Sequence, residues 1–162
     1  MERELALAFL AKVAIPPIVF HFLMLTYARA WSVLGREPFT AWRISREEGL
    51  YLLVGFFWAS VGITSFLFGE KMVGNFEEHV LRDCWRYWAH SPFRDPGTKG
   101  AEGVGVFAFI LPRYFLDALV VRGWKPDYLT VLVAWLPSAA IYWLVVGAST
   151  YYRISYYYSL NC

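Results

Sequence analysis

The chain has 162 residues, of which 58% are hydrophobic and 20% aromatic, and its formal net charge is +2. This composition is too apolar for an ordinary soluble domain, and the chain is too long for a single-span anchor. The near-neutral charge provides no basic stripe of the kind that nucleic-acid binding requires. We therefore expect an all-α integral membrane protein: one polytopic domain over residues 1–162, with three to four transmembrane helices and one interfacial amphipathic helix.

The first predicted span covers about residues 7–31 and is interrupted only by Lys12 and by Pro16-Pro17. Lys12 is expected to snorkel, with its ammonium at the interface. The proline pair removes two backbone donors and predicts a kink or a restart of the helix. His21 lies well inside the span, where an ionisable side chain is a candidate haem ligand, quinone contact or proton relay. We favour a neutral histidine that hydrogen-bonds a neighbouring helix.

The second predicted span covers about residues 47–69 and has no charged residue from Leu50 to Gly69. Ser45 precedes it and Glu48 follows three positions later, which is a capping box ahead of an apolar run. The helix is therefore expected to begin near Arg46.

A stripe of small residues runs along this second span. Gly55, Gly62 and Gly69 recur every seven residues, and Ala59 lies between the first two. Small residues at such spacing let helix backbones approach closely in lipid, so the stripe predicts a helix-packing interface. The helix that packs against it belongs either to this chain or to another chain, and the sequence does not decide between the two.

A surface helix is predicted at about residues 76–89, with Asn75 as its cap and Glu78 at the matching third position. One face is apolar and includes Trp85 and Trp88, and the opposite face carries mixed charges. We expect this helix to lie on the membrane surface or, because its charges are mixed, against a partner subunit.

Neither a metal site nor a disulfide framework is predicted. The spacings of His79, Cys84 and His90 match no zinc pattern. Cys84 and Cys162 are the two cysteines of the chain, and two free thiols are favoured over a bridge between them. A haem with two histidine ligands would need a second buried histidine beside His21, and the other two lie in a polar segment. We predict no catalytic residue, no cofactor and no enzymatic activity.

The third apolar stretch, residues 103–121, contains Arg113 and Asp117, and the last predicted span covers residues 128–152 without a charge. Arg113 and Asp117 are four positions apart, so on a helix they share a face and are expected to form an intramembrane ion pair. If residues 103–121 cross the membrane, there are four spans and both termini lie on one side. If they do not cross, the expectation is three spans with the termini on opposite sides.

Two parts of the sequence resemble the mitochondrial carrier family. Residues 43–49, RISREEG, followed by GFFWASVGITSFLFGEK, resemble its matrix helix, its acidic-Gly element and the helix after it; Glu102-Gly103 and LPSAAIYW resemble the same pieces. The family's Pro-x-acidic-x-x-basic signature is absent from the first span, so no substrate-site residue is carried over. The resemblance implies a mitochondrial inner-membrane location.

The leading functional hypothesis is a non-catalytic accessory subunit of a larger multi-subunit membrane complex, and the complex that we consider first is an energy-converting complex of the mitochondrial inner membrane. Its expected partners are other membrane subunits and lipids, and its proposed contact residues are Gly55, Ala59, Gly62, Gly69, Trp85 and Trp88. The alternative is a small-solute transporter that uses Arg113, Asp117 and His21. A haem protein or membrane enzyme would depend on His21 alone.

Overall fold

The computed structural model describes residues 2–39, 43–84, 103, 105 and 108–160, and 85% of these residues are helical, with no strand among them. Three helical stretches are long and apolar enough to cross a membrane: Arg3–Leu34, Arg46–Arg82 and Tyr128–Tyr158. At a rise of 1.5 Å per residue they measure roughly 45 to 55 Å. Because a bilayer's hydrocarbon core is only about 30 Å thick, each would extend beyond it.

The first stretch joins α1 (Glu2–Phe9), a π-helical turn η1 (Leu10–Ala14) and α2 (Ile15–Leu34). The predicted restart of the helix is confirmed: the π turn ends at Ala14, and α2 begins at Ile15 with the two prolines in its first turn. α2 ends at Gly35, whose φ of 64° gives the left-handed conformation that glycine adopts without strain.

The second stretch is α3 (Arg46–Asp83), and its predicted start is confirmed. The Ser45 side chain accepts from the Glu48 N–H at 3.1 Å, and the Glu48 carboxylate accepts from the Ser45 N–H at 2.7 Å. The expected separate surface helix is wrong over residues 76–83, because α3 continues through Asn75 without a break. Phe76 is buried against the first and last helices, and this packing holds the helix together there.

The last part of the chain forms α5 (Leu111–Val121), α6 (Tyr128–Tyr142), a second π turn η4 (Trp143–Gly147) and α7 (Ala148–Tyr158). α5 and α6 are joined by a short turn in which Gly123 has a φ of 91°. Asp127 caps α6 by accepting from the Thr130 N–H at 2.9 Å.

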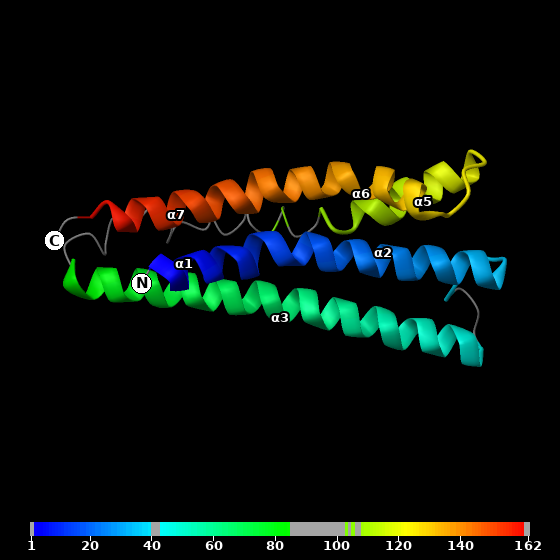
Figure 1. Cartoon of the computed structure of the whole chain (residues 1–162), viewed down its shortest axis with the longest axis horizontal. Coiled ribbons are helices and arrows are strands. Elements are labelled where there is room, and N and C mark those ends of the chain that lie inside the picture. Colours follow the sequence, from blue (N-terminus) through cyan, green and yellow to red (C-terminus); the bar gives the residue numbers. More distant parts are fainter. Residues whose placement is uncertain (1, 40–42, 85–102, 104, 106–107, 161–162) are drawn as a thin grey trace.

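The topology differs from the expectation for three spans. α5 has 11 residues and is about 17 Å long, so it is too short to cross a hydrocarbon core as a helix. Nevertheless α3 and α6–α7 run parallel, with α2 antiparallel to both, and the two termini lie at the same end (Figure 1). The linked prediction of three spans with termini on opposite sides is therefore wrong, because it requires consecutive long apolar helices to alternate in direction, whereas α3 and α6–α7 run in the same direction.

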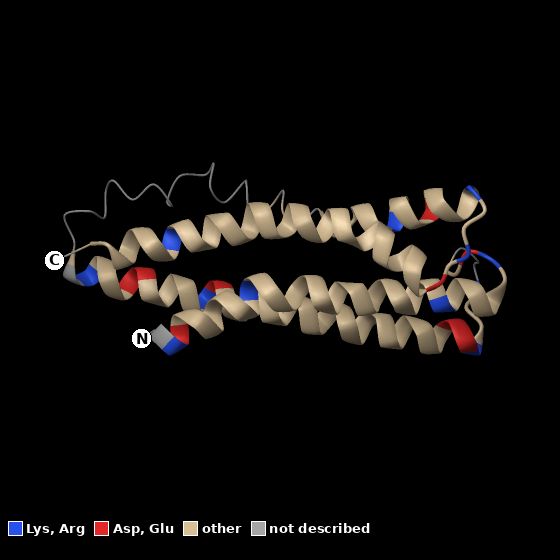
Figure 2. Cartoon of the chain, turned by 45° about the horizontal axis from the view of Figure 1, so that its top comes forward, with Lys and Arg blue, Asp and Glu red and all other residues tan. Residues whose placement is uncertain are grey.

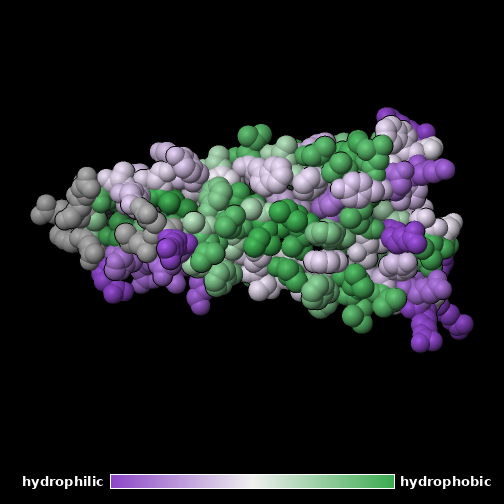
Figure 3. Space-filling view, in the orientation of Figure 1, coloured by the Kyte–Doolittle hydropathy of each residue, from purple (hydrophilic) through white to green (hydrophobic). Residues whose placement is uncertain are grey.

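Two hydrophobic clusters hold the ends of the bundle together. At the end with the termini, Leu5, Phe76, Leu81 and Tyr157 join α1, α3 and α7. At the other end the buried residues come from α2, α5 and α6: Met24, Ala28, Leu116, Val131 and Ala134. Charged residues gather towards both ends, and apolar side chains cover most of the surface between them (Figures 2 and 3).

Candidate functional site

The turn before the two prolines is the place where the first helix lacks its own hydrogen bonds. The Ile15 N–H donates to the Leu10 carbonyl, so the Ala11 carbonyl loses its usual α-helical donor. The carbonyls of Lys12 and Val13 would accept from residues 16 and 17, but both are prolines and have no N–H. Three consecutive carbonyls therefore need partners from outside their own helix. We call residues 10–17 the proline-opened turn.

Side chains from two other helices satisfy these three carbonyls. The Ser65 hydroxyl on α3 donates to Ala11 at 2.6 Å. From the other side, the hydroxyl of Tyr142 donates to Lys12 at 2.6 Å, and the indole N–H of Trp143 donates to Val13 at 3.2 Å. In an apolar environment an unsatisfied carbonyl costs several kcal/mol, and neighbouring helices commonly provide the missing donors. The proline-opened turn is thus the point that ties α3 and α6–η4 to the first helix.

A group of charges with two buried cations lies beside this turn. The Lys12 side chain is fully buried and its ammonium contacts the Glu70 carboxylate on α3. Arg153 on α7 is also buried; its Nη1 lies 3.1 Å from Glu70 and its Nε lies 2.7 Å from Glu77. Two cations and two carboxylates from three helices therefore neutralise one another. The expected snorkelling of Lys12 is wrong, because partners on other helices keep its ammonium inside the bundle.

This charge group is best explained as a structural one. Because Lys12 and Arg153 are buried, removal of their carboxylate partners would leave uncompensated positive charge inside the bundle. Within the described part of the chain, no group of three or more His, Cys, Asp or Glu side chains is placed to hold a metal ion. The four residues connect the first helix to α3 and α7.

The predicted pair of Arg113 and Asp117 forms, and it has a stronger partner that the sequence did not indicate. Nε of Arg113 lies 3.8 Å from the Asp117 carboxylate, while Nη2 lies 2.7 Å from the carboxylate of Glu37. The Tyr27 hydroxyl donates to the same Glu37 carboxylate at 3.2 Å. Arg113 and Glu37 are exposed, so this cluster lies at the surface, at the end of the bundle opposite the termini.

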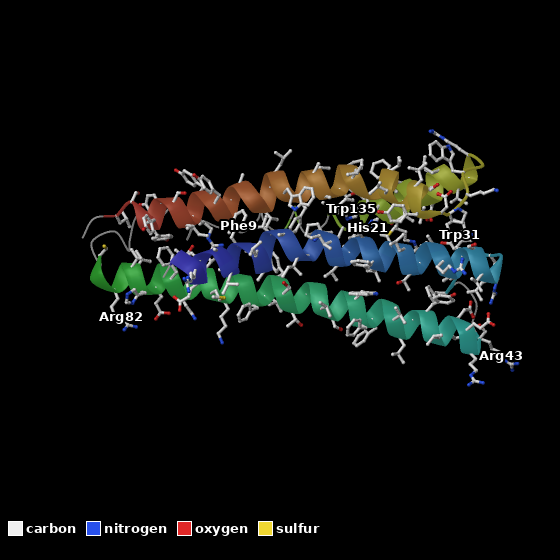
Figure 4. All side chains as sticks on the ribbon, in the orientation of Figure 1. Phe9, His21, Trp31, Arg43, Arg82 and Trp135 are labelled. Atoms are coloured by element: carbon white, nitrogen blue, oxygen red, sulfur yellow. The ribbon has the colours of Figure 1, made fainter. Side chains whose placement is uncertain are left out.

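His21 is not part of that cluster. Its ring lies 5.1 Å from the Trp135 ring and 5.7 Å from the Tyr128 ring, between α2 and α6 (Figure 4). The Trp135 indole N–H donates to the Pro17 carbonyl at 2.9 Å. Nδ1 of His21 is buried without a hydrogen-bond partner among the described residues, so the expected hydrogen bond to a neighbouring helix is absent at that atom. The proposed grouping of Arg113, Asp117 and His21 is not brought together.

The small-residue stripe of α3 lies against the first helix of the same chain. A Cβ on Gly55 would lie 3.4 Å from Leu23, and one on Gly62 would lie 3.4 Å from Val19. Gly69 packs more tightly: a Cβ there would lie 2.6 Å from the Lys12 backbone nitrogen and 2.7 Å from the carbonyl oxygen of Ala8. The stripe thus packs against another helix of the same chain, and the two helices approach most closely at Gly69.

The outer side of α3 is uncovered by the described chain. In its most apolar 18-residue window no residue is buried, compared with 44% in the first helix and 39% in the last. Large side chains project from this surface, with Phe56 75% exposed and Phe57 56% exposed. Trp85 and Trp88, the proposed contacts of the surface helix, lie outside the described residues.

The prediction of free thiols is wrong at Cys84, which is disulfide-bonded. The only other cysteine of the sequence, Cys162, lies outside the described residues. Spacing could not indicate this bond, because it depends on α3 and α7 ending at the same end of the bundle. Cys84 is buried at the end of α3.

The comparisons with known proteins find no relative. No protein-family model, curated protein or solved structure matches this chain. The resemblance to mitochondrial carriers therefore gains no support from them, and the functional argument depends on this chain's own geometry.

Proposed function

We propose that this chain is a non-catalytic, multi-pass subunit of a larger membrane complex, in which the outer side of α3 contacts another membrane subunit. The observation that carries the proposal is the asymmetry of burial among the three apolar helices. The first and last helices each bury about two-fifths of their most apolar window, whereas α3 buries none. α3 is therefore held on one side only, and its other side is available to a partner.

The use of polar groups inside the bundle supports the same proposal. The carbonyls of the proline-opened turn are paired with Ser65, Tyr142 and Trp143, and the charges of Lys12 and Arg153 are paired with carboxylates. These groups are occupied in joining helices, which suits a structural role. The exposed Phe side chains of α3 are of the type that is enriched in the buried centre of protein interfaces.

A site-specific photo-crosslinker at Phe57, which is exposed and does not line either cavity beside α3, tests this proposal in native membranes. We expect a discrete adduct with another protein at this position. Leu144 on η4 is the matched control, because it is similarly apolar and 73% exposed but lies on a different helix. Phe57→Ala combined with Leu53→Ala, one turn earlier on the same exposed face, is expected to weaken co-purification of the cross-linked protein, and Leu144→Ala is not. Adducts with lipid alone at Phe57 would contradict the proposal.

The proposed location is the mitochondrial inner membrane, and its support is the sequence resemblance alone. Fractionation with an inner-membrane marker tests it independently of the proposed assembly. Recovery of the protein with another membrane would reject this location and leave the contact surface on α3 open to the crosslinking test.

A small-solute transporter is the second candidate function. It is favoured by the pairing of the buried Lys12 with the partly exposed Glu70, and by buried hydroxyls of Ser138 and Thr150 that have no hydrogen-bond partner among the described residues. Such groups are typical of polar pathways through membrane proteins. Flux of a solute into liposomes containing the pure protein, lost in Glu70→Gln, would support it. Ion- and solute-tight liposomes would reject it.

A further inference from the structure

An apolar groove runs along the side of the bundle between α2, α3 and residues 109–113. It has two parts, with volumes of about 400 and 540 Å³, and both are lined by Phe20, Leu23, Ala59, Phe109 and Ile110. Along α3 the two parts together extend from Tyr51 to Leu67. At 1.5 Å per residue this is a length of about 24 Å.

The length of the groove suits an acyl chain. One leaflet of the hydrocarbon core is only about 15 Å deep, half of about 30 Å. The groove is therefore long enough to hold one acyl chain of a single leaflet along its whole depth.

The groove ends at a cluster of both charges. Arg113 lines this end, and its guanidinium contacts Glu37 at 2.7 Å and Asp117 at 3.8 Å. A guanidinium has five N–H donors in a fork that suits phosphate, and the Arg113 side chain is 53% exposed. Tyr27 fixes Glu37 by donating to its carboxylate at 3.2 Å. One cation beside two carboxylates complements a headgroup that carries both a phosphate and an ammonium.

We propose that this groove binds one acyl chain of a phosphatidylethanolamine-type lipid, with the phosphate at Arg113 and the ammonium at Glu37 and Asp117. A purely anionic headgroup fits less well, because the two carboxylates would repel it. The inference rests on insertion of the chain into a membrane, which is part of the proposed function, and is independent of the proposed contact on α3.

Native mass spectrometry of the protein from mixed-lipid nanodiscs tests this site. The probes are phosphatidylethanolamine and phosphatidylglycerol with identical acyl chains. We expect wild type to retain phosphatidylethanolamine preferentially, and Ala59→Phe to reduce its occupancy at least about tenfold, since loss of two buried methylene contacts suffices for that factor. Ala140→Phe, at an exposed alanine of α6 outside the groove, is the matched control and should retain the lipid.

Charge variants test the headgroup assignment separately. Arg113→Gln is expected to weaken retention of both lipids. Glu37→Gln should bring the ratio of retained phosphatidylethanolamine to retained phosphatidylglycerol towards one. Equal retention by wild type, Ala59→Phe and Glu37→Gln would overturn the proposal. A mass equal to two copies of the chain without lipid would also overturn it, since a second copy would then cover the groove.

A photoreactive acyl chain on phosphatidylethanolamine keeps the test decisive if Ala59→Phe fails to fold. In wild type we expect crosslinks on residues 51–67 and 109–113, in excess of those on the exposed side of α6 near Leu136. An even distribution between the two surfaces would reject the site. It would leave the proposed assembly intact, because that is read from protein adducts at Phe57, which does not line the groove.

Discussion

Replacement of Tyr142 by Phe tests the role of the proline-opened turn. The change removes one hydroxyl and keeps the ring, which is fully buried. That hydroxyl donates to the Lys12 carbonyl at 2.6 Å, and Pro16 has no N–H to replace it. Interhelical hydrogen bonds in membranes contribute on average about 0.6 and at most about 1.7 kcal/mol. An unsatisfied buried acceptor costs about 1–3 kcal/mol. We therefore expect Tyr142→Phe to lower the free energy of unfolding by about 1–2 kcal/mol.

Equilibrium unfolding in mixed detergent–SDS micelles measures this difference. Pro16→Ala restores a backbone N–H that can donate to the Lys12 carbonyl, so in that background Tyr142→Phe should lower the unfolding free energy by less than half as much. Tyr151→Phe is the control, because Tyr151 is 67% exposed. Equal losses with and without Pro16 would refute the idea that the proline creates the need for the Tyr142 hydroxyl.

Four further predictions concern packing, pH, topology and the disulfide bond of Cys84. Gly69→Ala should destabilise the protein strongly in the same unfolding assay, because the new Cβ would lie 2.6 Å from a backbone atom of Lys12. Gly62→Ala should be tolerated, because its Cβ would lie 3.4 Å from the Val19 side chain. Equal losses of stability in the two variants would refute the described packing. Hydrogen bonds from the N–H and hydroxyl of Thr130 hold the pKa of Asp127 below its usual value. Stability from this cap is therefore present above about pH 4 and is lost as the pH falls further. Thermal melts between pH 7 and pH 3 should show a smaller acid loss for Asp127→Asn, and an unchanged loss would contradict the assignment. Protease accessibility of terminal tags in sealed vesicles should place both termini on one side, and tags on opposite sides would contradict the topology. Cys84 should resist thiol labelling until it is reduced, and labelling without reductant would contradict its disulfide bond.

Features that depend on neighbouring residues could be predicted from the sequence. The capping box at Ser45 and Glu48 and the loss of hydrogen bonds at Pro16-Pro17 are local, because a cap or a missing N–H acts within one turn. The three long apolar helices follow from composition and length in the same way. The pairing of Arg113 with Asp117 also follows from spacing on one helix.

Features that depend on distant contacts could not be predicted. Tyr142 lies 130 positions from the carbonyl that it satisfies, and the partners of Lys12 lie on α3 and α7. Asn75 is a good local cap, yet burial of Phe76 on neighbouring helices overrides it and α3 continues. The direction of the last helix could not be predicted either, because counting spans alternates the direction at each long apolar helix, whereas α3 and α6–α7 run in the same direction.

The size and composition of the particle extracted in mild detergent test the central claim most directly. Native electrophoresis followed by identification of the co-migrating chains makes this measurement without any variant. A subunit held through the outer side of α3 should migrate in a complex much larger than its own 18.7 kDa, together with other membrane proteins. Migration as a single chain or as a small homo-oligomer would contradict the account.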